Sequence, residues 1–238
     1  MLLARYYDAL IDWERRLARE GPFLKKLLTG RRVLVAACGT GGHLPALERE
    51  GYEVTGIDAD PEMVNAARAK GGGQVELMQL EECGRLGENF DGVLCLGNVL
   101  PNLSGPNQME LAVTEMYRAL VPGGVFFTQN LNYDQRWREK ARFFPVLSGR
   151  AGPEEVILFK FADYRGAHID FHAVFLVRRG EGKWEQTVKT SRQRPVFRQD
   201  LENACRLSGF RRIETWGSYA GEPFDVQESG DLLLAAWK

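Results

Sequence analysis

The feature that most constrains this sequence is the alternation of short apolar runs with helical segments between residues 31 and 130. Runs rich in β-branched residues occupy 31–38, 52–58, 74–79, 92–96 and 124–130, and helical patterns separate them at 43–50, 61–70 and 108–120. Strands that alternate with helices are typical of a parallel sheet covered on both faces, because each crossover connection carries a helix. We therefore predict an α/β fold with a doubly wound sheet.

The segments outside this alternation predict a cap and a lid. Apolar side chains recur at helical spacing through residues 1–30, where Gly21-Pro22 is expected to separate two helices. The runs 155–161, 168–178 and 183–190 resemble strands and have no helix between them. Such a pattern predicts an antiparallel insertion in the α/β fold.

The remaining segments complete the sheet. A helix over 198–208 and strands over 210–216 and 231–237 would bring it to seven, mostly parallel strands. We predict a single domain with four parts, namely a helical cap (1–30), a ligand-binding core (31–150), an antiparallel lid (151–195) and the end of the core sheet (196–238).

Composition restricts the class of protein. The 31 Lys and Arg residues nearly balance the 32 Asp and Glu residues, so the chain lacks the positive charge with which proteins bind nucleic acid nonspecifically. No apolar run approaches the ~20 residues of a membrane span, and the first residues lack the apolar core of a signal peptide. We expect a cytoplasmic protein that binds no membrane.

The spacing of cysteine and histidine argues against a disulfide framework and a metal centre. The cysteines are scattered and form no Cys-x-x-Cys pair, which predicts reduced thiols at Cys38, Cys83, Cys95 and Cys205. His168 and His172 lie on one predicted strand without a defined third ligand, so we expect no metal site.

Two loops at the carboxyl ends of predicted strands carry the signal for a ligand. The loop 37–42, Ala-Cys-Gly-Thr-Gly-Gly, follows the first strand directly, and its glycines let the backbone approach a ligand and turn into the next helix. Asp58 ends the second strand, where a carboxylate can accept hydrogen bonds from both hydroxyls of a ribose. The two loops together predict an adenosine-containing cofactor.

The residues after the glycine loop narrow the choice of cofactor. A dinucleotide fingerprint would have a glycine three positions after Gly41, where this chain has Leu44, and no Lys-Ser/Thr follows as in a P-loop. S-adenosylmethionine, which has no phosphate to bind, is the remaining common cofactor of this class.

Three stretches of the chain resemble a known family. VLVAACGTGGHLPALEREGYEVTGIDADPEM (33–63), FDGVLCLGNVLPNL (90–103) and LVPGGVFFTQNLNYD (120–134) are similar to motifs of class I S-adenosylmethionine-dependent methyltransferases. Within that class, ACGTG, CLGN and NYD resemble the glycine N-methyltransferase type. The resemblance extends to RLAREGPFLKKLL in the first thirty residues and, weakly, to Gly209-Phe210.

The resemblance implies residues that hold the cofactor. Arg16 would bind the methionine carboxylate, and the loop residues Ala37, Gly39 and Gly41 would line the methionine and sulfonium portion, with Cys38 as a small residue among them. Toward the adenosine end, the implied residues are Asp58 for the ribose, Ala59 and Met63 beside the adenine, and Glu81, or alternatively Glu82, for its amino group.

The chain departs from the family pattern at two positions. Val35 stands where relatives have an acid, which would weaken cofactor binding unless a backbone carbonyl or water replaces it. Leu131 stands where the glycine-type enzymes have an arginine for the amino-acid carboxylate, and a leucine cannot make that bidentate contact. Glycine is therefore a doubtful substrate.

Methyl transfer from a sulfonium depends mainly on holding two reactants in line. The candidate catalytic residues are accordingly orienting groups and one anion binder, and they comprise Tyr6, Asn98, Asn132, Tyr133 and Arg194. The resemblance also implies that Leu96 and Asn98 lie beside the sulfonium and the substrate.

We predict an S-adenosylmethionine-dependent methyltransferase that acts on a small-molecule acceptor, more readily an amine than an oxygen. The alternatives are a non-catalytic cofactor-binding regulatory subunit, which Val35 would favour, and an RNA methyltransferase. A nicotinamide-dependent oxidoreductase is disfavoured by Leu44. Neither the acceptor nor the oligomeric state can be deduced from these patterns.

Overall fold

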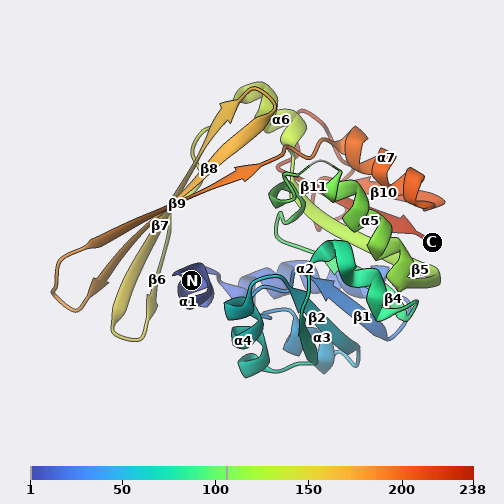
Figure 1. Ribbon diagram of the computed structural model, residues 1–238, viewed down its shortest axis with the longest axis horizontal. Coiled ribbons are helices and arrows are strands. Elements are labelled where there is room, and N and C mark those ends of the chain that lie inside the picture. The colour runs from blue at the N-terminus through green and yellow to red at the C-terminus, as the bar shows by residue number, and fades with distance from the viewer. Residues whose placement is uncertain (1, 106) are drawn as a thin grey trace.

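The computed structural model of the chain describes residues 2–105 and 107–238, and its centre is a seven-stranded sheet (Figure 1). The strand order is β10-β11-β5-β4-β1-β2-β3. The strands are β1 (Arg32–Ala36), β2 (Glu53–Asp58), β3 (Gln74–Leu77), β4 (Phe90–Cys95), β5 (Leu120–Leu131), β10 (Arg212–Trp216) and β11 (Asp231–Trp237). Strand β11 runs in the direction opposite to the other six strands. This architecture confirms the predicted α/β sheet.

Helices cover both faces of this sheet, as a doubly wound fold requires. They are α3 (Leu44–Arg49), α4 (Pro61–Lys70), α5 (Gln108–Ala119), α7 (Arg198–Ser208) and the short 3-10 turns η1 (Leu80–Leu86) and η2 (Leu100–Asn102). Leu34 of β1 packs in one core cluster with α5 and α7, whereas the adjacent Val33 packs in another with α4. Successive strand residues point to opposite faces, so each face has its own apolar core.

The fourth helix begins and ends where its sequence predicts. The side chain of Asp60 accepts a hydrogen bond from the backbone N–H of Glu62 at 2.9 Å, and Pro61 is the first helical residue. Gly71 ends the helix with a φ of 79°. The glycine triplet 71–73 therefore forms a turn that ends the helix.

The N-terminal cap contains α1 (Leu2–Leu10) and α2 (Trp13–Leu27), and the predicted break at Gly21-Pro22 is wrong. The chain breaks instead before Trp13, where Asp12 caps α2 by accepting a hydrogen bond from the N–H of Arg15. Pro22 lies inside the helix and removes one hydrogen bond, that to the carbonyl of the exposed Ala18. Buried side chains on both sides of Pro22 keep the helix continuous.

The strand predicted over 124–130 begins earlier than expected and includes Pro122, Gly123 and Gly124. Helix α5 ends at Ala119, and β5 begins at Leu120, so these three residues lie inside the strand. Gly123 has a φ of 82°, and the pairing of β5 with β4 shifts in register between Phe90 and Gly92. The strand accommodates the proline as an irregularity at its start.

A second, antiparallel sheet extends from the core (Figure 1). It has the order β6-β7-β8-β9, with β6 (Leu147–Ala151), β7 (Glu154–Arg165), β8 (His168–Arg179) and β9 (Glu185–Gln193). The sequence predicts β7, β8 and β9 but not the short β6. Helix α6 (Tyr133–Glu139) connects β5 to this sheet. None of the described helices has the length and apolar character of a membrane span.

The second sheet packs against the rest of the molecule at two places. Tyr6 of α1 lies in an apolar cluster with Val156, Leu158 and Phe175. Farther along the sheet, the ring of Trp137 on α6 lies 5.5 Å from the ring of Tyr164 on β7. The sheet is thus held by the N-terminal helix at one place and by α6 at another.

Candidate active site

A cavity of about 400 Å³ lies at the carboxyl ends of β1 and β4. The strand order reverses between these two strands, which is where α/β sheets bind ligands. The volume is in the range of small-ligand sites. Eight residues selected from the sequence line it, namely Arg16, Ala37, Cys38, Gly39, Asp58, Ala59, Met63 and Leu96.

Asp58 holds the glycine loop as well as lining the cavity. Its Oδ2 accepts a hydrogen bond from the backbone N–H of Gly39 at 2.8 Å, and its Oδ1 accepts one from that of Asp60 at 3.0 Å. Burial raises the pKa of the Asp58 carboxyl, and these backbone donors oppose the rise. Each carboxylate oxygen keeps a lone pair with which it can accept a hydroxyl.

The glycine loop turns through three left-handed residues, Ala37, Gly39 and Gly41, with φ of 56°, 57° and 77°. Gly41 does not line the cavity. A Cβ added to it would lie 2.9 Å from the Cβ of Ala67 on α4, so its role is close packing of the loop on that helix. Ala37 adopts the same backbone region in spite of its methyl group.

Arg16 reaches the cavity from α2 and is held there by Glu20. Its Nε donates to Oε1 of Glu20 at 3.0 Å, and its guanidinium lies against Gly97 at the end of β4. Tyr7 also forms a hydrogen bond with this side chain, and the other guanidinium N–H groups can bind an anion such as a carboxylate. Glu20 is 1% exposed and also lies 2.7 Å from Nε2 of His43.

The pKa values of Glu20 and His43 are both lower than usual. The hydrogen bond with His43 and the charge of Arg16 outweigh burial and hold the pKa of Glu20 below its usual value. Burial, with the charges of Arg16 and Lys70, lowers the pKa of His43. The pair is therefore an ionised carboxylate and a neutral imidazole that donates its Nε2–H.

Asp8 of α1 joins the cap to the rim of the cavity. Its Oδ1 accepts hydrogen bonds from Nε1 of Trp13 at 2.8 Å and from Oγ1 of Thr40 at 2.7 Å, and Lys70 pairs with it at 2.8 Å. These donors hold the pKa of Asp8 below its usual value in spite of burial. One side chain thus connects both N-terminal helices with the glycine loop and α4.

An acceptor without a hydrogen-bond partner lies next to the cavity wall formed by Gln79 and Leu80. Glu81 does not line the cavity, but it follows the lining residues Gln79 and Leu80, and its Oε2 is buried without a hydrogen-bond partner. Glu82 is occupied, because it accepts from the backbone N–H of Gln79 and pairs with Arg85 at 2.9 Å. An amino group is the kind of donor that Glu81 lacks.

Cys38 lines the cavity as a protonated thiol. Burial, together with the charge of Asp58, raises its pKa to about 12. A thiol with this pKa is not a nucleophile at neutral pH. The other three cysteines, Cys83, Cys95 and Cys205, are also buried and free.

Tyr6, a predicted catalytic residue, lies outside the cavity. Its side chain is 2% exposed in the cluster beneath the second sheet, and its hydroxyl donates to Oε2 of Glu154 at 3.0 Å. The neighbouring Tyr7 lines the cavity instead. Adjacent residues of a helix differ by about 100° in direction. The rotation of α1 about its own axis therefore determines which of the two tyrosines faces the cavity.

Asn98 and Tyr133 belong to a hydrogen-bonded network behind the cavity wall. Nδ2 of Asn98 donates to the hydroxyl of Tyr133 at 3.0 Å, and Oδ1 accepts from the backbone N–H of Leu131 at 3.0 Å. The Tyr133 hydroxyl lies 3.5 Å from Oε1 of Gln193, whose Nε2 donates to Oδ1 of Asn102 at 3.0 Å. Of these, Asn102 lines the cavity. Burial raises the pKa of Tyr133 to about 12, so its hydroxyl stays protonated.

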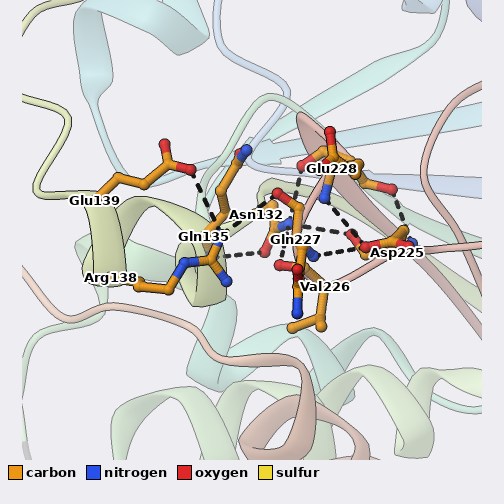
Figure 2. Close-up of polar contacts among 9 residues, drawn as sticks. Asn132, Gln135, Arg138, Glu139, Asp225, Val226, Gln227 and Glu228 are labelled. Atoms are coloured by element: carbon orange, nitrogen blue, oxygen red, sulfur yellow. Dashed lines mark hydrogen bonds and ion pairs between the residues drawn. The ribbon is translucent and has the colours of Figure 1, made fainter.

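The side chain of Asn132 is committed to backbone groups (Figure 2). Its Oδ1 accepts from the N–H of Gln135 and caps α6, and its Nδ2 donates to the carbonyls of Asp225, Val226 and Ser229. Arg194 lies farther from the cavity and pairs with Glu110 at 3.2 Å. Neither residue lines the cavity.

The structure also places the two departures from the family pattern. Val35 is 2% exposed and lines the cavity from β1. Leu131 ends β5 and pairs in register with Asp231 of β11. The wall also contains Tyr7, Trp13, His43, Gly97 and Asn102, which the sequence did not identify as site residues. The buried Glu20 was missed too, although its spacing of four from Arg16 on one helix was a usable signal.

Two other sequence features contribute nothing to the cavity. The basic run 136–142 is not a free cationic face, because Lys140 packs over Trp137 and Arg142 pairs with Asp163. His172 stacks on Phe161 in the second sheet. Within residues 2–105 and 107–238, no group of acids, histidines or cysteines has the arrangement of a metal site.

Comparison with known proteins relates this chain to methyltransferases. Residues 33–124 match a family model described as a methyltransferase domain. A glycine/sarcosine N-methyltransferase of Parasynechococcus marenigrum is 32% identical over 138 residues, which is 54% of this chain and 49% of that protein. A glycine/sarcosine/dimethylglycine N-methyltransferase of Actinopolyspora halophila is 32% identical over 227 residues, which is 90% of this chain and 38% of that protein. The chain thus spans half or less of these relatives.

The fold has close counterparts among solved structures. An S-adenosylmethionine-dependent methyltransferase from Clostridium acetobutylicum superimposes with a TM-score of 0.78 at 14% identity, covering 99% of this chain and 96% of that one. The chemistry of the cavity fits S-adenosylmethionine, since Asp58 and Arg16 line it and the unpartnered Oε2 of Glu81 is buried next to the lining residue Leu80. Residues 33–124 thus match the methyltransferase domain family, and the chain resembles class I S-adenosylmethionine-dependent methyltransferases of the glycine N-methyltransferase type.

Proposed function

We propose that the protein transfers a methyl group from S-adenosylmethionine to a small-molecule amine. The observation that carries this proposal is the cavity at the β1–β4 switch point, in which the carboxylate of Asp58 and the guanidinium of Arg16 both line the wall. The relatives at 32% identity are named as N-methyltransferases of glycine and sarcosine, which supports a nitrogen acceptor over an oxygen.

Different residues in and next to the cavity would bind different parts of the cofactor. Arg16, fixed by Glu20, would bind the methionine carboxylate, and Asp58 would accept from the ribose. Ala59 and Met63 line the wall after β2, where they would flank the adenine, and Glu81 would accept from its amino group. The backbone of Ala37, Cys38 and Gly39, together with Leu96, would surround the methionine and sulfonium portion.

Catalysis would depend on orientation. The bound cofactor supplies a methyl group on a positively charged sulfonium. The positive charge would pass with the methyl group to the acceptor nitrogen, which would then release a proton to solvent, so the protein mainly has to hold an uncharged nitrogen in line and exclude bulk water during transfer. Asn98 and Tyr133, linked through Gln193 to the lining residue Asn102, would support the acceptor side of the wall from behind, and we assign this network a positioning role.

The second sheet favours a small acceptor. We infer that this sheet acts as a lid, because it contacts α6 and also α1, the helix that contributes Tyr7 to the cavity wall (Figure 1). A lid of this kind encloses a small molecule more readily than a folded polymer. We therefore propose a small amine as acceptor, and RNA binding with a steep salt dependence would contradict this.

Two measurements test the proposal in sequence. Thermal unfolding is followed with S-adenosylmethionine, S-adenosylhomocysteine, NADH and ATP, and only the first two should raise Tm. Transfer of a labelled methyl group is then measured over primary, secondary and tertiary small amines, including glycine and sarcosine. Stabilisation without transfer to any amine would contradict the enzymatic function and favour a non-catalytic cofactor-binding protein.

A further inference from the structure

The outer face of the second sheet, which points away from α1 and α6, carries an apolar patch. Side chains alternate along a strand, and Val156 and Leu158 of β7 pack beneath α1 on the inner face. On the outer face, Phe143 stacks against Phe159 with 5.8 Å between the ring centroids. The apolar patch comprises Phe143, Ile157, Phe159, Phe161, Val174, Leu176 and Val188.

This patch is open to solvent. Phe143 is 62% exposed and Val188 is 49% exposed, and the sheet itself extends away from the core (Figure 1). An antiparallel sheet with one face in water normally has polar residues on that face. Strand β7 departs from this pattern, because the outward Ile157 lies between the buried Val156 and Leu158. A contiguous exposed apolar surface of this kind marks an interaction site.

Charged residues with opposite signs flank the patch on β8. The outward side chains of this strand are, in order, Asp170, His172, Val174, Leu176 and Arg178. The acid and the base therefore lie at equal distances on either side of Val174. They are about 27 Å apart along an extended strand, so they cannot contact each other within one chain.

We propose that the apolar patch is the interface of a symmetric homodimer, in which the second sheets of two copies pack face to face. A twofold interface uses the same surface of both copies. With the axis across the strands at Val174, this residue meets its counterpart, and Arg178 of each copy lies toward Asp170 of the other. Packed sheets keep their strand directions within about 30° of each other, which preserves this pairing.

The charged residues at the edges of the patch can take part in contacts between copies. Asp170 pairs with Arg165 at 2.9 Å, and Arg178 pairs with Glu155 at 2.5 Å. A carboxylate has two oxygens and a guanidinium has five N–H donors, so each can bind a second partner. On β7 the same axis brings Glu155 toward Asp163 of the other copy, and each of these acids already pairs with an arginine of its own chain. The like charges there are therefore compensated.

The outer face is large enough for a stable dimer. Strands β7 and β8 have 12 residues each, so that together with β9 they cover about 40 Å by 14 Å. Two copies would bury roughly 1,100 Å² by this measure, which exceeds the ~1,000 Å² expected of a specific interface. Because α1 and α6 pack on the inner face, this inference does not depend on the proposed function.

Sedimentation velocity tests the proposal at protein concentrations from about 1 to about 300 µM, where an interface of this size dissociates. The wild type should pass from monomer to dimer. Val188 pairs with Val174 and so lies on the proposed axis, where Val188→Glu would bring two like charges together and raise the dissociation constant of the dimer at least tenfold. Leu207→Glu, at an exposed leucine of α7, is the matched control and should stay within twofold of the wild type. A dimer that Val188→Glu leaves unchanged would overturn the proposal. A wild type that stays monomeric would also overturn it, and binding of that monomer to phosphatidylserine vesicles would assign the patch to a membrane surface.

Exchange of the two charges on β8 tests the twofold arrangement. Arg178→Glu and Asp170→Arg should each weaken the dimer at least fivefold, and the double variant should return to within twofold of the wild type. Since the two positions cannot contact each other in one chain, this rescue requires contact between copies. Thermal unfolding checks that each variant is folded. Two weakened single variants without rescue in the folded double variant would overturn the arrangement.

Discussion

Nε2 of His43 lies 2.7 Å from Oε2 of Glu20, and this neutral imidazole holds the buried carboxylate that in turn orients Arg16. Because both pKa values are lowered in the folded protein, the arrangement is stable only where His43 is uncharged and Glu20 is ionised. The position of Arg16 in the cavity thus depends on this titratable pair. Of the two residues, only His43 lines the cavity wall.

The pH dependence of stability should reveal this pair. A histidine whose pKa is lower in the folded than in the unfolded state contributes stability that is complete above the unfolded value of about 6.5 and is lost as the pH falls below it. His43→Gln keeps a donor for Glu20 without titrating, so its free energy of unfolding should fall less steeply between about pH 6.5 and 5. Urea unfolding at four pH values measures the slope, with His168→Gln as the control. Identical slopes for His43→Gln and the wild type would refute the assignment.

Asp58 has two roles that a single substitution removes together. Asp58→Ala eliminates the acceptor for the ribose and releases the backbone N–H of Gly39, so affinity for S-adenosylhomocysteine should fall by about 30-fold, or roughly 2 kcal/mol. Calorimetric titration measures the change. Glu53→Gln, at the opposite end of the same strand, is the control and should bind normally. Unchanged affinity in Asp58→Ala would remove Asp58 from the cofactor site.

Two glycines on or near α2 should respond oppositely to alanine. A Cβ on Gly42 would collide with the indole of Trp13, so Gly42→Ala should cost about 1–3 kcal/mol of stability and shift the indole fluorescence. Gly21 lies within α2 with open space around it, so Gly21→Ala should stabilise by about 0.5–1 kcal/mol. Denaturant unfolding of both variants gives the comparison. The same sign for both would contradict the described contact.

A glycine in place of Ala37, in the glycine loop, should stabilise the protein. The φ of 56° at Ala37 is one that glycine adopts freely and that costs other residues about 1–2 kcal/mol. Ala37→Gly should therefore raise the free energy of unfolding by about 0.5–1 kcal/mol, whereas Ala36→Gly in the adjacent strand should lower it. Thermal unfolding distinguishes the two. A destabilised Ala37→Gly variant would show that its methyl group is more important for packing than for backbone strain.

Asn132 should prove important for stability rather than for binding. It caps α6 and donates to three backbone carbonyls, so Asn132→Ala should cost about 1–3 kcal/mol of stability. The affinity of the folded variant for S-adenosylhomocysteine should be unchanged. Asn203→Ala on the exposed side of α7 is the control for both measurements. A loss of affinity without a loss of stability would restore Asn132 to the site.

Local patterns were enough to predict the core and the cofactor side of the cavity. The glycine loop and Asp58 lie at strand ends, and parallel strands bring their carboxyl ends together whatever the details of packing. The same reasoning does not extend to Tyr7, Trp13 and Arg16, because their position depends on how a helical cap rolls onto the sheet. The role of Arg16 was predicted from the family resemblance, because helical periodicity alone does not distinguish it from a surface arginine.

The acceptor side was harder to predict for a physical reason. Asn98, Asn132 and Tyr133 occupy the correct end of the sheet, but an amide at a strand end can satisfy backbone groups as readily as a ligand. Which of these it does depends on partners such as Gln193 and Ser229, which are 60 to 97 residues away in sequence. The helix through Pro22 was missed for a similar reason, since burial on both sides of the proline outweighed one lost hydrogen bond.

The contact of α1 with the second sheet also has a consequence for the order in which the chain folds. Tyr6 and Arg5 both bind Glu154, almost 150 residues later in sequence. Contacts this distant form late, because the loop between them must close first. During synthesis, α1 therefore cannot form these contacts until the second sheet, which begins at Leu147, has been made. The cofactor cavity should reach its final shape only after most of the chain has left the ribosome.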